Sequence, residues 1–153
     1  MRPQHGPAMS IPADPLDGYD IEAQVGFLLR RAHQRHAALF LEGMAALDLT
    51  PTQFNALIRV VEHAPVTQNH LGRLSAMDPA TIQGVVRRLV ERGLIERRHD
   101  PADRRTILLS ASPAGCTLAA TAVAAGRRIT EATLTPLTPA ERTKLLYLLE
   151  RIT

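Results

Sequence analysis

The sequence predicts a mainly α fold with a single small β-hairpin, and three observations support this prediction. Apolar residues recur at helical spacing over most of the chain. The spacing changes to that of strands only once, after Gly93. Four capping residues directly followed by proline mark helix starts, because proline is well tolerated at a first helical position. These pairs are Thr50-Pro51, Asp78-Pro79, Ser112-Pro113 and Thr138-Pro139.

The N-terminal region divides into an arm and a long helix. Residues 1–18 are rich in Pro, Gly and Asp and lack periodicity, which predicts a disordered arm. A helical pattern without proline then runs from Asp20 to about Leu47. It has a broad apolar stripe on one side and a weaker apolar row, from Phe27 to Ala45, on the other. Two apolar faces on one helix suggest that a partner subunit covers one of them.

Three shorter helices follow. The first begins at Pro51, repeats apolar residues at i, i+3, i+4 and i+7 from Phe54, and ends before Pro65. Thr67 is positioned to cap a short second helix, and Asp78 caps a third. Gly93 stands where a left-handed C-terminal cap is expected.

Two short strands, 94–98 and 106–109, then flank a polar loop with a proline, which is typical of a hairpin. Ser112 opens an Ala-rich helix to about Thr133, and Thr138 opens a last, leucine-rich one. Three helices followed by a hairpin with a basic tip predict a winged helix-turn-helix. We expect residues 49–111 to form this DNA-binding domain, and residues 19–48 and 112–153 to form a helical dimerisation region.

The helix that starts after Asp78 is the candidate recognition helix. Its apolar stripe leaves a polar face whose Thr and Gln can bond to base edges, and whose Arg residues can reach guanine or phosphate. Gly84 removes a side chain where the backbone can approach a groove. An ordinary solvated helix face is the competing interpretation. The outward residues are Thr81, Gln83, Gly84, Arg87, Arg88 and Arg92.

The charge distribution favours the DNA-binding interpretation. Of the 18 basic residues, eight are arginines between Arg73 and Arg105, and that window carries the whole net charge of +3. Four of them flank the predicted hairpin turn, where an arginine can enter a narrow minor groove. Asp103 can orient a neighbouring arginine by a charge-assisted hydrogen bond. The four are Arg97, Arg98, Arg104 and Arg105.

Several motifs resemble those of MarR-family regulators over about residues 20–153. The motifs are Leu49-Thr50-Pro51-Thr52-Gln53-Phe54, Thr81-Ile82-Gln83, Arg88-Leu89-Val90-Glu91-Arg92-Gly93-Leu94-Ile95 and Asp100-Pro101-Ala102-Asp103-Arg104-Arg105. The resemblance implies a homodimeric winged helix-turn-helix repressor that binds a pseudo-palindromic double-stranded operator, with Arg105 as the minor-groove residue. The chain departs from the family at Gly84 and Arg87, so the resemblance implies no particular operator sequence.

Such regulators generally respond to a small molecule bound between the dimerisation helices and the DNA-binding lobe. The first-helix pattern from Gln24 to His36 is similar to that of regulators of aromatic-acid catabolism. A histidine in an apolar pocket can recognise a carboxylate or phenol, and phenylalanines can stack on an aromatic ring. We therefore expect a site for a small aromatic acid or its thioester, although satisfied core histidines are the simpler interpretation. The candidate residues are Arg30, His33, His36, Phe40 and Phe54.

Other functions are less well supported by the sequence. Metal sensing needs three or four converging ligands, and the histidines form no tight cluster with Cys or Asp. Thiol sensing would depend on the lone Cys116, for which a buried, inert site is the commoner outcome. A winged helix that binds only protein would not need the arginines. No catalytic motif, cofactor-binding loop, secretory signal or membrane-length apolar run is present, so we expect a cytoplasmic regulator without a cofactor.

Overall fold

The computed structural model describes residues 16–153, so most of the predicted arm lies outside the described residues. The described chain forms two compact units that divide after Gln34. Helix α1 (Val25–Met44) begins in the first unit and continues into the second. The predicted start of this helix at Asp20 is wrong. The Asp20 side chain accepts a hydrogen bond from the Glu22 backbone N–H at 2.9 Å, and the segment before Val25 forms turns.

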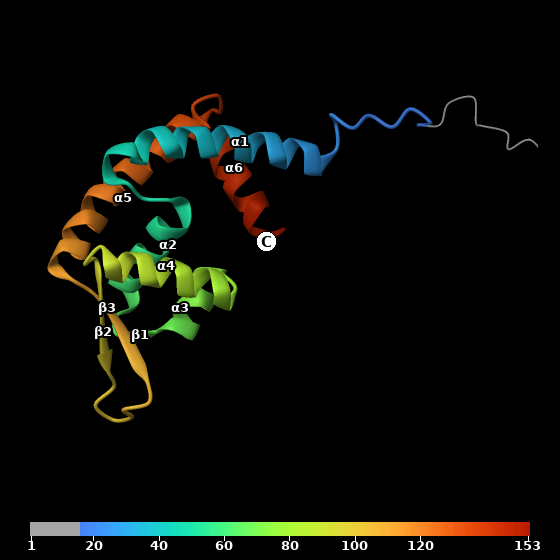
Figure 1. The fold of residues 1–153 in the computed structure, drawn as a ribbon. Helices are drawn as coiled ribbons and strands as arrows, with labels where there is room; N and C mark the ends of the chain where they lie inside the picture. Colours follow the sequence, from blue (N-terminus) through green and yellow to red (C-terminus); the bar gives the residue numbers. More distant parts are fainter. Residues whose placement is uncertain (1–15) are drawn as a thin grey trace, which may run out of the picture. The chain divides into compact units, whose positions relative to one another are not determined.

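The second unit contains all the remaining elements (Figure 1). Helices α2, α4 and α5 end within a few residues of the expected positions, and the sheet has three strands. The elements are η1 (Ala45–Leu47), α2 (Pro51–His63), β1 (Val66–Thr67), α3 (Gln68–Leu74), α4 (Pro79–Glu91), β2 (Ile95–His99), β3 (Ile107–Ala111), α5 (Pro113–Leu134) and α6 (Pro139–Glu150).

The capping residues set the helix starts as predicted. Thr50 accepts the Gln53 backbone N–H, and Gln53 in return accepts the Thr50 N–H, which is a complete capping box. The same N-cap bond starts three more helices, each with proline at the first position. Gly93 has a φ of +69°, which confirms the expected left-handed turn at the end of α4.

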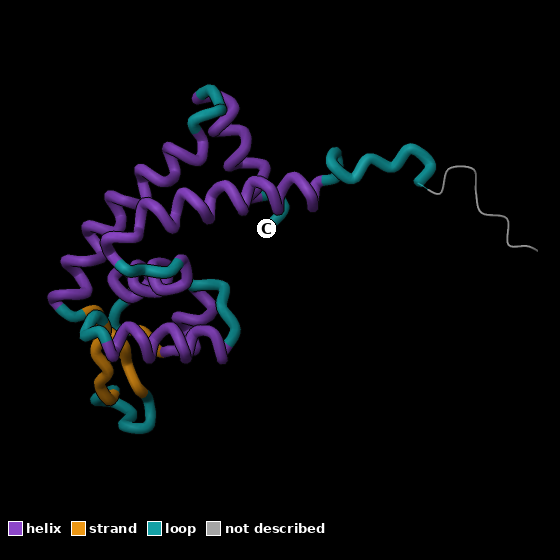
Figure 2. The backbone as a smooth tube through the Cα atoms, turned by 45° about the horizontal axis from the view of Figure 1, so that its top comes forward, coloured by secondary structure: helices purple, strands orange, loops and turns teal. Residues whose placement is uncertain are grey.

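The sheet is antiparallel with strand order β1-β3-β2. The predicted hairpin is confirmed: Ile95 pairs with Ala111 at its base, and His99 pairs with Ile107 near its tip. Strand β1 was not predicted, and it adds Val66 and Thr67 to the other edge of β3. In Figure 2 the hairpin and its long loop extend away from the helices of this unit.

A hydrophobic core joins α2, α3, α4 and the sheet. Most of its fully buried side chains come from the predicted apolar stripes, and burying each one contributes about 1.5–3 kcal/mol. In α2 the prediction is wrong at one position, because Val60 is buried while Val61 is 42% exposed. This packing fixes α4 with its polar face outward. The largest members are Leu57, Val60, Leu71, Ile82, Val86, Leu89, Ile95 and Leu109.

Helices α5 and α6 differ in how many of their residues are buried. Helix α5 buries a stripe of small residues with Ile129, whereas α6 buries no residue although four of the five positions 145–149 are leucines. Leu146, Tyr147 and Leu148 of α6 are each more than 40% exposed. Among residues 16–153, no helix has the length and apolarity needed to cross a lipid bilayer.

Candidate nucleic-acid interface and ligand cavity

The outward face of α4 carries the predicted polar residues. Thr81, Gln83, Arg87 and Arg88 are exposed, while Gly84 is partly covered. A Cβ atom at Gly84 would meet no atom within 4 Å, so the space beside it is open. Helix α4 therefore presents a hydrogen-bonding and cationic surface with one gap in the side-chain layer.

Thr81 has a second role in the start of α4. Its hydroxyl donates to one carboxylate oxygen of Asp78, and its backbone N–H donates to the other. These bonds lower the pKa of Asp78, the hydroxyl bond most. Because its hydroxyl proton is already donated to Asp78, Thr81 can only accept a hydrogen bond from a DNA base.

Arg92, the C-cap residue of α4, is exposed as the helical pattern predicts, but its guanidinium also bonds to the backbone. Its guanidinium donates to the carbonyl oxygen of Asp48 at 2.6 Å and to that of Leu47 at 3.2 Å. Both acceptors end the short helix η1, where carbonyl groups lack partners within the helix. Arg92 thus ties the end of α4 to the turn before α2.

The hairpin tip is ordered by a network of short-range hydrogen bonds. Asp103 accepts the backbone N–H of Arg105 at 3.0 Å and the hydroxyl of Thr106 at 2.9 Å. These two donors hold the pKa of Asp103 below its ordinary value. His99 Nδ1 lies 2.8 Å from the carbonyl oxygen of Arg104. Because a carbonyl only accepts, Nδ1 carries the donated proton.

Asp103 was expected to bond to an arginine side chain, but within residues 16–153 it makes no such hydrogen bond. The carboxylate instead fixes the backbone of Arg105, so it orients this arginine from the main chain. Arg104 and Arg105 are both exposed on the loop. The tip therefore presents two free guanidinium groups on an ordered backbone.

A groove of about 530 Å³ lies between the hairpin and the helices of the second unit. Gln83 of α4, Arg97 of β2 and Arg105 of the tip all line it. Gln68 and Asn69, in the first turn of α3, also line it, although no sequence pattern indicated them as site residues. Gln83 and Arg97 further line a smaller hollow of about 360 Å³ beside Gly84 and Arg87. These two hollows thus bring predicted residues of the helix and of the hairpin together, whereas Thr81, Arg88 and Arg104 line neither hollow.

A cavity of about 440 Å³ brings together three of the five predicted effector residues. His36 and Phe40 come from α1, and Phe54 comes from α2. The rings of Phe40 and Phe54 meet edge to face with centroids 5.8 Å apart, and the His36 ring lies 6.3 Å from Phe40. Arg59 also lines the cavity and pairs with Glu62 at 3.1 Å. Sequence reasoning missed Arg59, which lies five residues after Phe54.

His36 is held by a residue from α5. Its Nδ1 lies 3.0 Å from the hydroxyl oxygen of Thr133, and Thr133 donates its hydroxyl proton to the Ile129 carbonyl at 2.8 Å. Next to it, Arg35 donates to the Ala132 carbonyl at 3.1 Å. These bonds connect the second half of α1 to the end of α5.

Arg30 and His33 belong to the first unit. There the Arg30 guanidinium carbon lies 5.6 Å from the Phe27 ring centroid, a cation–π contact. His33 is exposed. Their part in ligand binding remains a prediction.

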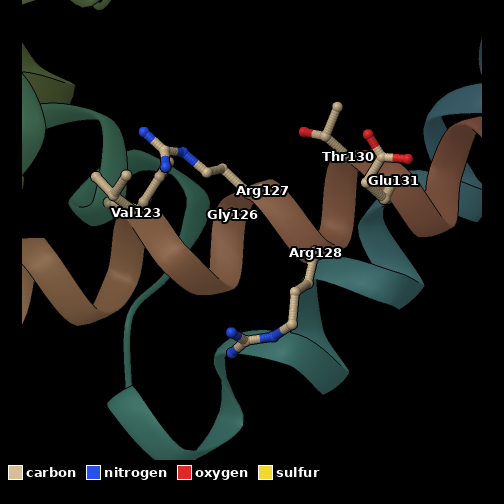
Figure 3. Close-up of a pocket in the computed structure, with 7 residues that line it drawn as sticks. Val123, Gly126, Arg127, Arg128, Thr130 and Glu131 are labelled. Atoms are coloured by element: carbon tan, nitrogen blue, oxygen red, sulfur yellow. The ribbon is translucent and has the colours of Figure 1, made fainter.

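A second cavity, of about 710 Å³, lies along α5 (Figure 3). Phe54 lines this cavity as well as the one beside His36, so its ring forms a shared wall. Arg127 and Arg128 point to different sides of α5, and both are exposed. The two cavities place aromatic, apolar and guanidinium groups within the same part of the second unit.

Two competing interpretations concern a metal ion and the thiol of Cys116. No group of three or more His, Cys, Asp or Glu residues within residues 16–153 is arranged to hold a metal ion. The expectation of a buried Cys116 is wrong, since this thiol is exposed. The buried stripe of α5 runs through Gly115 and Ala119, and Cys116 lies beside that stripe.

Comparisons with known proteins agree with this surface. Residues 47–106 match the MarR family model. The transcriptional repressor NicR of Pseudomonas putida is 39% identical over 90% of this chain and 89% of its own length. A probable transcriptional regulator of Pseudomonas aeruginosa has a solved structure that is 50% identical, with a TM-score of 0.84, over 88% of this chain and all of that one. BpsR of Bordetella bronchiseptica, whose DNA binding is regulated by 6-hydroxynicotinic acid, is 39% identical, with a TM-score of 0.83, over 88% of this chain and 96% of that one.

The fold and the basic surface therefore define a winged-helix transcriptional regulator that binds DNA. The chain belongs to the MarR family.

Proposed function

We propose that the protein is a homodimeric repressor that binds a pseudo-palindromic operator and releases it when a small aromatic acid, or its thioester, occupies the cavity beside His36. The groove lined jointly by Gln83, Arg97 and Arg105 is the single observation that best supports the DNA-binding part. It combines a residue able to read a base edge with two arginines suited to phosphate or to a narrow minor groove.

Contacts to DNA are assigned by chemistry and position. Gln83, Arg87 and Arg88 lie on the exposed face of α4 and enter the major groove, with Thr81 and Gly84 beside them. Arg104 and Arg105 reach the neighbouring minor groove from the hairpin tip, and Asp103 positions Arg105 through its backbone.

Dimerisation is supported by apolar side chains left uncovered in the second unit. Leu41 of α1 is 76% exposed, and α6 has no buried residue. Exposed apolar surface is typical of an interface when it is large. A two-fold dimer presents two α4 helices to half-sites about one helical turn apart.

The effector part is supported by the chemistry of the cavity and by the relatives. Phe40 and Phe54 offer ring edges to a flat aromatic ligand, while Arg59 can exchange its bond to Glu62 for a ligand carboxylate. The named ligand of BpsR, 6-hydroxynicotinic acid, has this chemistry.

Release of DNA follows from where the cavity lies. It is built from α1 on one side and α2 on the other, and α2 packs directly against α4. A ligand that separates α1 from α2 therefore moves α4 relative to the partner's copy and changes the spacing of the two recognition helices.

The experiment combines DNA binding with ligand release. A labelled duplex taken from upstream of the protein's own gene is titrated with protein at several salt concentrations. We expect the logarithm of the affinity to fall with the logarithm of salt by about 0.9 per phosphate contact, and 6-hydroxynicotinic acid to release the duplex. A salt-independent complex, or no DNA binding, favours a winged helix that binds only protein, and release by zinc alone favours a metal sensor.

A further inference from the structure

The hydrogen bonds around His36 determine which of its nitrogens carries the proton. The hydroxyl of Thr133 has one proton, and it donates that proton to the carbonyl oxygen of Ile129 at 2.8 Å. The hydroxyl can then only accept at its 3.0 Å contact with His36 Nδ1. The donor in that contact is therefore the Nδ1–H group.

A neutral imidazole carries one proton. With this proton on Nδ1, the Nε2 atom has a free lone pair and acts only as an acceptor. Nε2 makes no hydrogen bond to any residue in the described part of the chain, and His36 lines the cavity with Phe40 and Phe54. The cavity therefore offers a ligand one imidazole acceptor and, from Arg59, one cationic donor.

These two groups require different atoms of the ligand. A carboxylate has no proton to donate, so it suits Arg59 and does not suit the Nε2 lone pair. A ring hydroxyl or ring N–H suits Nε2. We propose that Thr133 is a positioning residue that holds His36 in its Nδ1–H form, so that the site selects aromatic acids bearing a ring O–H or N–H over those without one. This inference rests on the proposed effector function, which it makes more specific.

The chain provides a matched control at the C-cap of the same helix, α5. Thr135 makes the same bond from its hydroxyl to the carbonyl four residues earlier, Glu131, at 2.9 Å, but it is exposed and contacts no histidine. Thr133→Val and Thr135→Val therefore remove the same group and the same kind of backbone bond. Only the first substitution removes the acceptor of His36 Nδ1–H, and Thr133→Ser restores it.

The first measurement needs no ligand. Nitrogen-15 NMR of the histidine rings at pH 8 distinguishes a protonated from an unprotonated ring nitrogen. We expect His36 to carry its proton on Nδ1 in the wild type, in Thr133→Ser and in Thr135→Val, and to show a mixture in Thr133→Val. A wild-type His36 with its proton on Nε2 would overturn the inference, whatever the ligand results.

The second measurement compares two probes, 6-hydroxynicotinic acid and nicotinic acid. They differ by one ring oxygen, which gives the first acid a proton to donate, either from O–H or, in its 6-oxo tautomer, from the ring N–H. By calorimetry at pH 8 we expect the hydroxylated acid to bind the wild type about 3- to 10-fold more tightly, the effect of one hydrogen bond. Thr133→Val brings this ratio to within about twofold of one, while Thr133→Ser and Thr135→Val retain it.

The outcomes separate the inference from the proposed function. Equal binding of the two acids by the wild type, or an unchanged ratio in Thr133→Val, contradicts the role of Thr133 and leaves the effector site standing. Binding of neither acid contradicts the proposed effector class and the selection with it, while the NMR result still decides the protonation of His36.

Discussion

The guanidinium of Arg92 donates a hydrogen bond to the carbonyl oxygen of Asp48 at 2.6 Å, and this bond joins the end of α4 to the turn before α2. Asp48 itself has a left-handed backbone with a φ of 49°. We therefore expect this arginine to stabilise the fold, because two of its N–H groups are bonded to these backbone carbonyls.

Replacing Arg92 with alanine tests this structural role. We expect Arg92→Ala to lower the free energy of unfolding by about 1 kcal/mol, because two charged hydrogen bonds are lost at a solvent-exposed site. Chemical denaturation measures this change. Arg87→Ala is the control, since Arg87 makes only a loose contact with Glu91 at 3.8 Å; it should leave stability nearly unchanged and weaken DNA binding. The reverse pattern would place Arg92 at the DNA.

Arg105→Ala tests the hairpin as a DNA contact. We expect weaker binding to the duplex and a salt dependence reduced by about one contact, because one guanidinium leaves the phosphate or minor-groove surface. Fluorescence anisotropy at four salt concentrations gives both values. Arg128→Ala, on α5 and outside the groove, should change neither of them. Equal effects of the two substitutions would show that net charge alone determines binding.

The order of the hairpin tip should persist in mild acid. The Arg105 backbone N–H and the Thr106 hydroxyl lower the pKa of Asp103 below 3.8, its ordinary value. A group whose pKa is lowered by folding contributes its stabilisation above the ordinary value and loses it as the pH falls through the lowered one. We therefore expect the Arg105 amide signal in NMR to change only below pH 3.8, and to show no such transition in Asp103→Asn. A midpoint above that value contradicts the network.

Gly84→Ala is expected to change the stability of α4 and its affinity for DNA in opposite directions. An added Cβ meets nothing within 4 Å, so the helix should gain up to about 1 kcal/mol from the better helix former. The same methyl group should weaken operator binding if the backbone of α4 lies close to the groove edge, as proposed. Unchanged affinity would show that this part of α4 stays away from the DNA.

Gly115→Ala tests the junction between α5 and the hairpin. A Cβ at Gly115 would overlap the carbonyl oxygen of Leu94, which already accepts the Ser112 N–H at 3.0 Å. We expect a loss of about 1–3 kcal/mol in the free energy of unfolding, because backbone must move to make room. Gly84→Ala is the control, because it adds the same methyl group at a position where the added Cβ meets no other atom within 4 Å. A stable Gly115→Ala protein would mean that this contact is loose.

Much of the fold was predictable because its signals are local. A capping residue followed by proline marks the start of α2, and Asp78 does the same for α4. Strand β1 was missed because two residues cannot show a period, and Thr67 was recognised only as a cap. The long helix was predicted to begin too early because Asp20 caps a turn instead of a helix.

The site was predictable in its residue types but not in its contacts. Periodicity places Arg92 outward, but only the fold brings the carbonyls of Leu47 and Asp48 within its reach. Asp103 was expected to bond to an arginine side chain, whereas it accepts the backbone N–H of Arg105. Nothing in the sequence links His36 to Thr133, which lies 97 residues later.

Ligand-dependent release of DNA is the most direct test of the central claim. Fluorescence anisotropy of the labelled upstream duplex is followed as 6-hydroxynicotinic acid is added to the wild type, to His36→Ala and to Thr135→Val. We predict that all three proteins bind the duplex equally, that the wild type and Thr135→Val release it, and that His36→Ala retains it at ligand concentrations that release the wild type. Equal release from His36→Ala and the wild type would contradict the assignment of the effector site to this cavity.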